Sequence, residues 1–323
     1  MRIFKSGSGA KILKLLRGGR TARLSLMLRC DSSNQLTGSH LQLRFAPRKL
    51  TGRAMQKIPV FKTFGNMVDS IIENLSAAFA MSWPWLLVLF LIRVSGDLFL
   101  LWSGISKLKP DQADTAQLYS VIFSTELLTA IVFSSIAVNW HRFILRNEVA
   151  EGSQRLRLDG LVWRYFLFVI VIFLLLALVT FGGVFGLTLV SVVLSYASKA
   201  LGILIGIFVG LPLVLLVFGM SARWSVKLVA IAMGNKDYTL SDAWRDTKGN
   251  TWRLTGLEFL FGCVLLLIGT VNGGAELFAA FVGSSLVAAV AAGVTVLVGW
   301  FSTLMGITML TSIYAFFVEK KQA

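Results

Sequence analysis

Long uninterrupted apolar runs alternate with short polar segments along most of this chain. The longest run, from Tyr165 to Ala222, contains one basic residue, Lys199, and no Asp or Glu. About 20 residues at a rise of about 1.5 Å cross a hydrocarbon layer about 30 Å thick, so apolar stretches of this length are typical of membrane-spanning helices. The run therefore predicts two spans, roughly 164–184 and 200–220, with a turn near 195–199.

Four further apolar runs complete a prediction of six spans. They cover about 83–102, 118–138, 254–271 and 294–317. Between the last two we expect an apolar helix over roughly 277–290 that does not cross the membrane. The predicted fold class is all-α, a polytopic membrane helix bundle formed by residues 55–323.

Residues 57–80 have a different pattern, in which apolar residues recur at spacings of three and four. Such a pattern is typical of an amphipathic helix, and next to a first span it predicts a helix on the membrane interface. Charged residues occupy the other side. The apolar positions are Ile58, Phe61, Phe64, Val68, Ile71, Ile72, Leu75 and Phe79.

The composition agrees with a membrane protein. Hydrophobic residues make up 56% of the 323 residues and charged residues 15%, whereas soluble domains carry about 25% charged residues. Of the net charge of +15, most lies in residues 1–54, which hold twelve Lys/Arg residues and one acid, Asp31. We expect this segment to be a disordered or non-native extension; a transit peptide and a basic arm on anionic lipid are the alternatives. No nucleic-acid partner is predicted, because the excess charge is confined to this segment.

The placement of Lys and Arg predicts the orientation. The connectors after the second and fourth spans are basic, whereas the loops after the first, third and fifth spans hold few Lys or Arg residues. Because basic loops remain in the cytoplasm, this alternation predicts six spans with both termini cytoplasmic.

Motifs of soluble enzymes are absent from the sequence. It contains no phosphate-binding loop, dinucleotide fingerprint, zinc-protease helix or nucleophile elbow. The histidines are His40 and His141, and neither has a neighbouring cysteine pair that could complete a zinc site. We therefore expect neither catalysis nor a bound cofactor or metal, and we expect His141 to lie at the membrane interface.

Three charged residues fall inside predicted spans. Arg93 and Asp97 are one helical turn apart on the first span, and Glu126 lies at a similar depth on the second. An isolated charge at the bilayer centre costs about 3 kcal/mol or more. We therefore predict that Arg93 faces the interior of the bundle and is neutralised by Asp97, Glu126 or both. Such a cluster serves either as a structural ion pair or as a proton or substrate relay.

Small residues form a stripe on the fourth predicted span, where Gly202, Gly206 and Gly210 recur at every fourth position. Small residues allow helices to approach closely in lipid. The stripe predicts packing within the chain, with a homodimer as the alternative.

The two basic connectors share a plan in which tryptophans stand beside arginines. Aromatic and basic residues are typical of the cytoplasmic interface, where they contact anionic headgroups. The predicted partner is thus the lipid bilayer with its anionic lipids. The interface residues are Trp140, Arg142, Trp244, Arg245, Trp252 and Arg253.

Two motifs in these connectors, NWHRFILRNE over 139–148 and SDAWRDTKGNTWRL over 241–254, carry a resemblance. They are similar to motifs of poorly characterised bacterial inner-membrane proteins. These include the YciC-like family and the membrane domain attached to some glycerophosphodiester phosphodiesterases. The resemblance covers roughly residues 56–318 and implies a six-helix membrane domain without known catalytic residues. The phosphodiesterase domain has no counterpart here, so its activity does not carry over.

The sequence favours a non-enzymatic integral membrane protein with a structural or envelope-associated role. The alternative is a small transporter or lipid-handling protein that uses Arg93, Asp97 and Glu126. A cavity that reaches Arg93 would favour this alternative.

Overall fold

The computed structural model describes residues 56–103 and 115–319, which are folded almost entirely into helices. The prediction of an all-α fold is confirmed for this part of the chain. The predictions made for residues 1–54, for the polar loop after the first span and for Lys320 and Lys321 fall outside the described residues.

Six of the described helices are long and apolar enough to cross a membrane. They are α2 (Leu75–Trp102), α3 (Thr115–Arg146), α4 (Gly160–Ala197), α5 (Lys199–Ala232), α7 (Thr251–Val282) and α8 (Ser285–Tyr314). The shorter elements are α1 (Val60–Glu73), a 3-10 turn (Gly152–Leu156), α6 (Leu240–Asp246) and a π-helical turn after α8 (Ala315–Glu319).

One predicted element is wrong. The structure has no separate helix over 277–290, because α7 continues to Val282 and α8 begins at Ser285. Gly283 makes the turn with φ of +66°, a left-handed conformation that glycine adopts at no steric cost. The helix continues past the predicted end near Val271 through Asn272, Gly273 and Gly274, since glycine is common inside membrane helices. The predicted turn near 195–199 is confirmed, with Ser198 separating α4 from α5.

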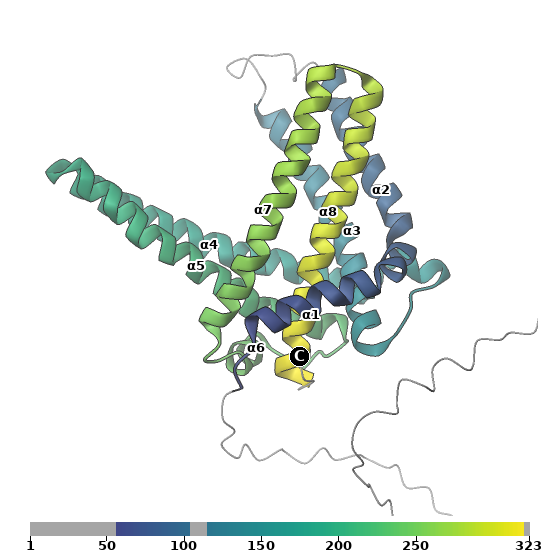
Figure 1. The fold of residues 1–323 in the computed structure, drawn as a ribbon, viewed down its shortest axis with the longest axis horizontal. Coiled ribbons are helices and arrows are strands. Elements are labelled where there is room, and N and C mark those ends of the chain that lie inside the picture. Colours follow the sequence, from purple (N-terminus) through teal and green to yellow (C-terminus); the bar gives the residue numbers. More distant parts are fainter. Residues whose placement is uncertain (1–55, 104–114, 320–323) are drawn as a thin grey trace, which may run out of the picture. The chain divides into compact units, whose positions relative to one another are not determined.

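Helix α8 occupies the centre of the described helices, since it contacts α1, α2, α3, α5 and α7. In Figure 1, α7 and α8 run side by side, while α4 and α5 form a hairpin that leans away from them. The buried core lies where the ends of α3, α5 and α8 meet the beginnings of α4 and α7. We call this the basic end, because the two basic connectors lie there.

Polar side chains join three helices inside this core. The indole N–H of Trp140 on α3 donates to the hydroxyl of Thr308 on α8 over 2.8 Å. The next residue, His141, has Nδ1 2.7 Å from the Thr311 hydroxyl and Nε2 3.2 Å from the Tyr165 hydroxyl on α4. Trp140 and His141 are both buried. The prediction that they face the membrane interface is therefore wrong: pairing with threonines allows these polar groups to lie inside the protein.

Helix α1 is amphipathic, as predicted, and packs against α7 and α8 through a face that includes Met67 and Ile71. Asn250, just before α7, holds the segment that leads into α1. Its Oδ1 accepts from the backbone N–H of Ile58 over 3.0 Å, and its Nδ2 donates to the carbonyl of Gln56 over 3.1 Å. These bonds fix the start of α1 against the start of α7.

Of the three glycines in the predicted stripe, two lie close to α4 and one does not. A Cβ at Gly202 would lie 2.9 Å from the carbonyl oxygen of Ser191 on α4, and one at Gly210 would lie 3.3 Å from Leu187. These two glycines therefore permit the close approach of α4 and α5. Gly206 has no atom within 4 Å of its Cβ position, so it takes no part in this packing.

Candidate functional site

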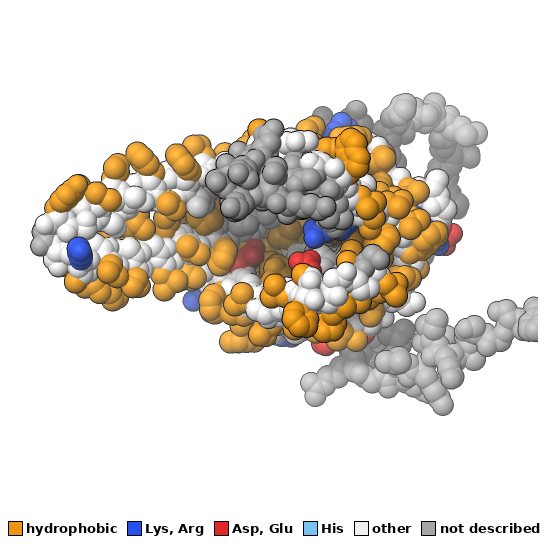
Figure 2. Space-filling view, turned by 90° about the horizontal axis from the view of Figure 1, so that it is seen from above, with side chains coloured by type: hydrophobic (Ala, Val, Ile, Leu, Met, Phe, Trp, Pro, Cys, Tyr) orange, Lys and Arg blue, Asp and Glu red, His pale blue; other side chains and the backbone are white. Residues whose placement is uncertain are grey.

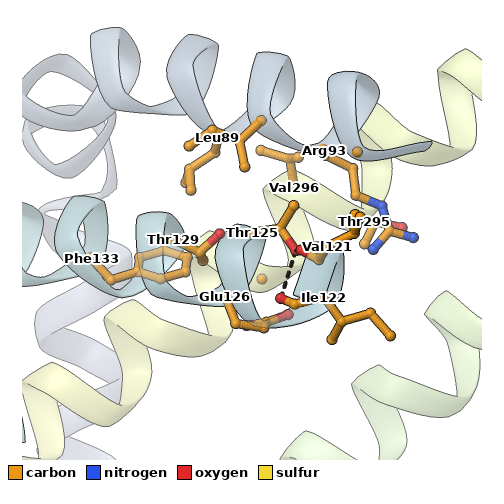
Figure 3. A pocket seen from close by; sticks show the side chains of 13 residues that line it. Leu89, Arg93, Val121, Ile122, Thr125, Glu126, Thr129, Phe133, Thr295 and Val296 are labelled. Atoms are coloured by element: carbon orange, nitrogen blue, oxygen red, sulfur yellow. Dashed lines mark hydrogen bonds between the residues drawn. The ribbon is translucent and has the colours of Figure 1, made fainter. Parts of the chain in front are cut away.

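A pocket of about 340 Å³ opens between α2, α3 and α8, next to the buried core. Arg93 on α2, Glu126 on α3 and Thr295 on α8 line it, together with Thr125 and Thr129 (Figure 3). The remaining walls are apolar. Seen from above, the molecule is hollowed, and acidic and basic side chains lie together in the hollow (Figure 2).

Arg93 is paired with an acid that the sequence analysis did not consider. Its Nη2 lies 3.7 Å from Oε1 of Glu276 on α7. The hydroxyl of Thr295 lies 2.9 Å from the same Oε1 and 3.2 Å from Oδ1 of Asn272. Since a hydroxyl has one proton, it donates to one of these oxygens at a time. The contacts link α2, α7 and α8 through one carboxylate.

Glu126 has a different environment. It lines the same pocket, but among the described residues it has no hydrogen-bond or ion-pair partner. Figure 3 shows its carboxylate apart from the Arg93 guanidinium, which lies beside Thr295. Glu126 therefore offers a carboxylate to whatever enters the pocket.

These positions test the predicted cluster in part. The structure brings Arg93 and Glu126 into one pocket, and no ion pair between these two side chains is found among the described residues, so neutralisation of Arg93 by Asp97, Glu126 or both stays a prediction. The side chain of Asp97 lies outside what the structure describes. Glu276 could have been recognised as the one acid between Glu258 and Glu319. It was missed because the fifth span was ended too early.

Gly96 shapes the narrow side of the pocket. A Cβ at this position would lie 3.1 Å from Cγ2 of Thr125 on α3. The Thr125 hydroxyl donates to carbonyls of its own helix, 2.8 Å to Ile122 and 3.0 Å to Val121. Its methyl group is therefore turned toward α2, and glycine is the residue that allows α2 and α3 to meet there.

The predicted interface arginines are engaged within the protein. Arg142 pairs with Glu148 at 2.5 Å, Arg245 pairs with Asp242 at 2.6 Å, and Arg253 donates to the carbonyl of Ile58 over 2.9 Å. The Trp252 side chain is exposed. The Arg142 pair ties the end of α3 to the connector that follows it, the Arg245 pair lies within α6, and the Arg253 bond joins the start of α7 to the segment before α1.

The Trp244 side chain is exposed on one side. Its ring stacks on Arg223 of α5, whose Cζ lies 3.4 Å from the ring centroid. Arg223 is buried and donates to the hydroxyls of Thr247 over 2.9 Å and Thr251 over 3.2 Å, and also to the Trp244 carbonyl. Neutral oxygens and an aromatic face thus surround this guanidinium. It joins α5, α6 and α7.

Helix α6 begins with a capping box. Thr239 is the N-cap, and its hydroxyl accepts from the backbone N–H of Asp242 over 3.1 Å. In return, Asp242 accepts from the backbone N–H and the hydroxyl of Thr239. The backbone hydrogen bond from Thr239, its hydroxyl and the charge of Arg245 hold the pKa of Asp242 below its usual range.

The pocket combines charged and hydroxyl groups with apolar walls. The described residues contain no cluster of three His, Cys, Asp or Glu residues that could hold a metal ion. The pocket lining offers a cation, a carboxylate and three threonine hydroxyls beside apolar walls. Such a mixture is typical of sites that hold a ligand with a polar and an apolar part.

The chain was compared with known proteins at three levels. No protein-family model, no curated protein and no solved structure matches it.

Proposed function

We propose that this multi-pass membrane protein is a small transporter or lipid-handling protein rather than a purely structural one. The ligand would be an amphiphilic or small polar molecule held in the pocket between α2, α3 and α8. Arg93 and Thr295 would bind its acceptor groups, and Glu126 would bind its donor groups. The protein would not act as an enzyme.

One observation carries this proposal: Glu126, in a helix apolar enough to span a membrane, lines an open pocket without a partner among the described residues. Intramembrane carboxylates are expensive and usually mark substrate or proton pathways. A purely structural carboxylate would be expected to pair, as Glu276 does with Arg93. We therefore assign Glu276 to the ion pair with Arg93 and Glu126 to ligand binding.

We also infer the finer placement of the protein. The Lys and Arg residues concentrated over 142–164 and 223–253 support an orientation with this end and both termini in the cytoplasm, as the positive-inside rule requires. A bacterial inner membrane and membership of the YciC-like group remain part of the proposal, and they rest on the connector motifs. External labelling of a cysteine introduced near residue 320 would refute this orientation.

Cysteine accessibility tests the proposed pocket. Thr129 would be replaced by Cys in a chain in which Cys30 and Cys263 are replaced by Ser. We expect a charged, membrane-impermeant thiol reagent to modify Cys at position 129, because the pocket must admit water and polar ligands. Leu178→Cys in the same background is the control, since this side chain is exposed on a candidate span and would face lipid.

A ligand measurement completes the test. Molecules that copurify with the detergent-extracted protein would be identified by mass spectrometry, for the native chain, Glu126→Gln and Glu73→Gln. Glu73 is an exposed acid of α1 outside the pocket, so its variant controls for the loss of a charge. We expect Glu126→Gln alone to lose the ligand. The proposal would be overturned if the reagent failed to modify Cys at position 129 and all three proteins copurified with the same molecules.

The structural alternative has one observation in its favour. The contacts of Glu276 with Arg93 and Thr295 tie α2, α7 and α8 together, which is what a purely architectural ion pair would do. If this were the whole role of the polar cluster, Glu126→Gln would leave both stability and copurifying molecules unchanged.

A further inference from the structure

A second pocket, of about 460 Å³, lies between the first turns of α4 and the last turns of α5, at the basic end. Arg164 on α4, Lys227 on α5 and Lys236 in the turn after α5 all line it. Its apolar walls include Phe168 and Ile231. The pocket therefore combines three cations with an apolar floor, and it is separate from the pocket that contains Arg93.

The cations of this pocket differ from three arginines of the connectors that have acidic partners. Arg142, Arg157 and Arg245 are each paired with a carboxylate at 3.0 Å or less. Within the described chain, Arg164 and Lys236 have neither an ion pair nor a hydrogen bond. Their charges are therefore available to a ligand.

Lys227 is only partly satisfied. Its ammonium group donates to the backbone carbonyl of Tyr238, a neutral acceptor. Asp237 and Asp242 act on it electrostatically, but Asp242 is already held by Arg245 at 2.6 Å. The pocket therefore keeps a positive balance, which complements an anion.

An apolar stripe leads from the pocket along α4. Leu167, Val171, Leu174 and Leu178 follow one another at spacings of four, three and four, and all four are exposed. Eleven residues of helix rise about 16 Å. This matches the thickness of one leaflet, about half of a hydrocarbon core of about 30 Å.

We propose that this pocket binds one anionic phospholipid. The phosphate lies among Arg164, Lys227 and Lys236, and one acyl chain follows the α4 stripe. Three cations around a phosphate provide charge-assisted hydrogen bonds, and the stripe provides the apolar contact that a soluble anion would not use. This proposal does not depend on the function proposed for the other pocket.

Two variants with the same change in net charge test the site. Arg164→Gln/Lys236→Gln removes two pocket cations. Lys62→Gln/Lys248→Gln removes two exposed cations that lie outside the pocket. The full chain in detergent would be titrated with dioleoyl phosphatidylglycerol, and bound lipid would be measured by native mass spectrometry. We expect the pocket variant to bind at least tenfold more weakly and the control to bind as the native chain does, because each headgroup contact with a basic residue contributes appreciably.

Further ligands distinguish a lipid from a soluble anion. We expect phosphatidylcholine and dihexanoyl phosphatidylglycerol to bind more weakly than the long anionic lipid, and inorganic phosphate not to displace it. Equal losses in both variants would show a diffuse surface charge and overturn the proposal. Displacement by phosphate would show a soluble-anion site and overturn it as well. If the double variant does not fold, Lys236→Gln alone, at an exposed turn position, gives the same comparison against Lys248→Gln.

Discussion

Replacement of Gly219 by Ala tests the tightest of the glycine contacts among the described residues. A Cβ at Gly219 on α5 would lie 2.5 Å from Oγ1 of Thr255 and 3.0 Å from Cγ2 of Thr251, both on α7. Neither atom can move far, because the χ1 angle of threonine is restricted and the Thr255 hydroxyl donates to the carbonyl of Leu215 over 3.2 Å. The clash of the added Cβ with these threonines can therefore be relieved only if α5 and α7 move apart.

The expected loss of stability follows from overpacking. Ordinary contact needs about 3.5 Å between the two groups, so the helices must move apart by close to an ångström at this point. Insertion of a methyl group into a packed site of this kind costs about 1–3 kcal/mol. Alanine also gains up to about 1 kcal/mol of helix propensity over glycine. A control on the same helix removes this gain from the comparison.

Gly206→Ala is that control, since Gly206 is also in α5 and has open space at its Cβ position. The folded fraction of the purified chain would be measured during SDS titration in mixed micelles. We expect Gly219→Ala to be less stable than Gly206→Ala by about 1–3 kcal/mol. Thr255→Ala should recover part of this loss in the double variant, because it removes the closest atom. Equal stability of the two alanine variants would refute the packing of α5 on α7.

Three other contacts give predictions of their own. Arg93→Gln and Glu276→Gln should lose less stability together than the sum of the single changes, by about 0.5–2 kcal/mol, since each removes the other's partner; additive losses in SDS titration would contradict the pair. Trp140→Phe should lower the free energy of unfolding by about 2 kcal/mol, because it removes a buried hydrogen bond and leaves a void. Trp252→Phe, at a side chain 70% exposed, should lose almost nothing. The pKa of Asp242 is lower in the folded protein than its ordinary 3.8, so its contribution to stability is present above about pH 4 and is lost as the pH falls further. The protection of the α6 amides, measured as their exchange rate relative to the intrinsic rate at each pH, should thus fall below pH 4 in the native chain and should show no such fall in Asp242→Asn.

The apolar pattern predicted the helices well because a long uncharged run has few ways to satisfy its backbone other than a helix. The break at Ser198 was visible in the same way, as the polar interruption of a run long enough for two helices. The end of α7 was not predicted. Asn272 and the glycines after it interrupt the pattern locally, but the intrahelical hydrogen bonds continue to Val282, since glycine is tolerated inside membrane helices.

The polar clusters were harder to predict, because they depend on which helices meet. Arg93 and Glu126 were identified as charges within membrane spans from their positions in the runs, yet the partner Glu276 comes from a helix distant in the sequence. Trp140 resembles an interfacial residue in sequence, and only the position of Thr308 on α8 explains its burial. Sequence periodicity gives the face of one helix, but it contains no information on the neighbour that covers this face.

The concentration of the buried core at the basic end has a mechanical consequence. Helices fastened at one end act as levers, so a small rotation about the core produces a displacement that grows along the helix. For α8, with 30 residues and a length of about 45 Å, a tilt of about 5° would move the far end by about 4 Å. Such a tilt would widen or narrow the pocket between α2, α3 and α8 that contains Arg93, while Trp140, His141 and their threonine partners keep their places.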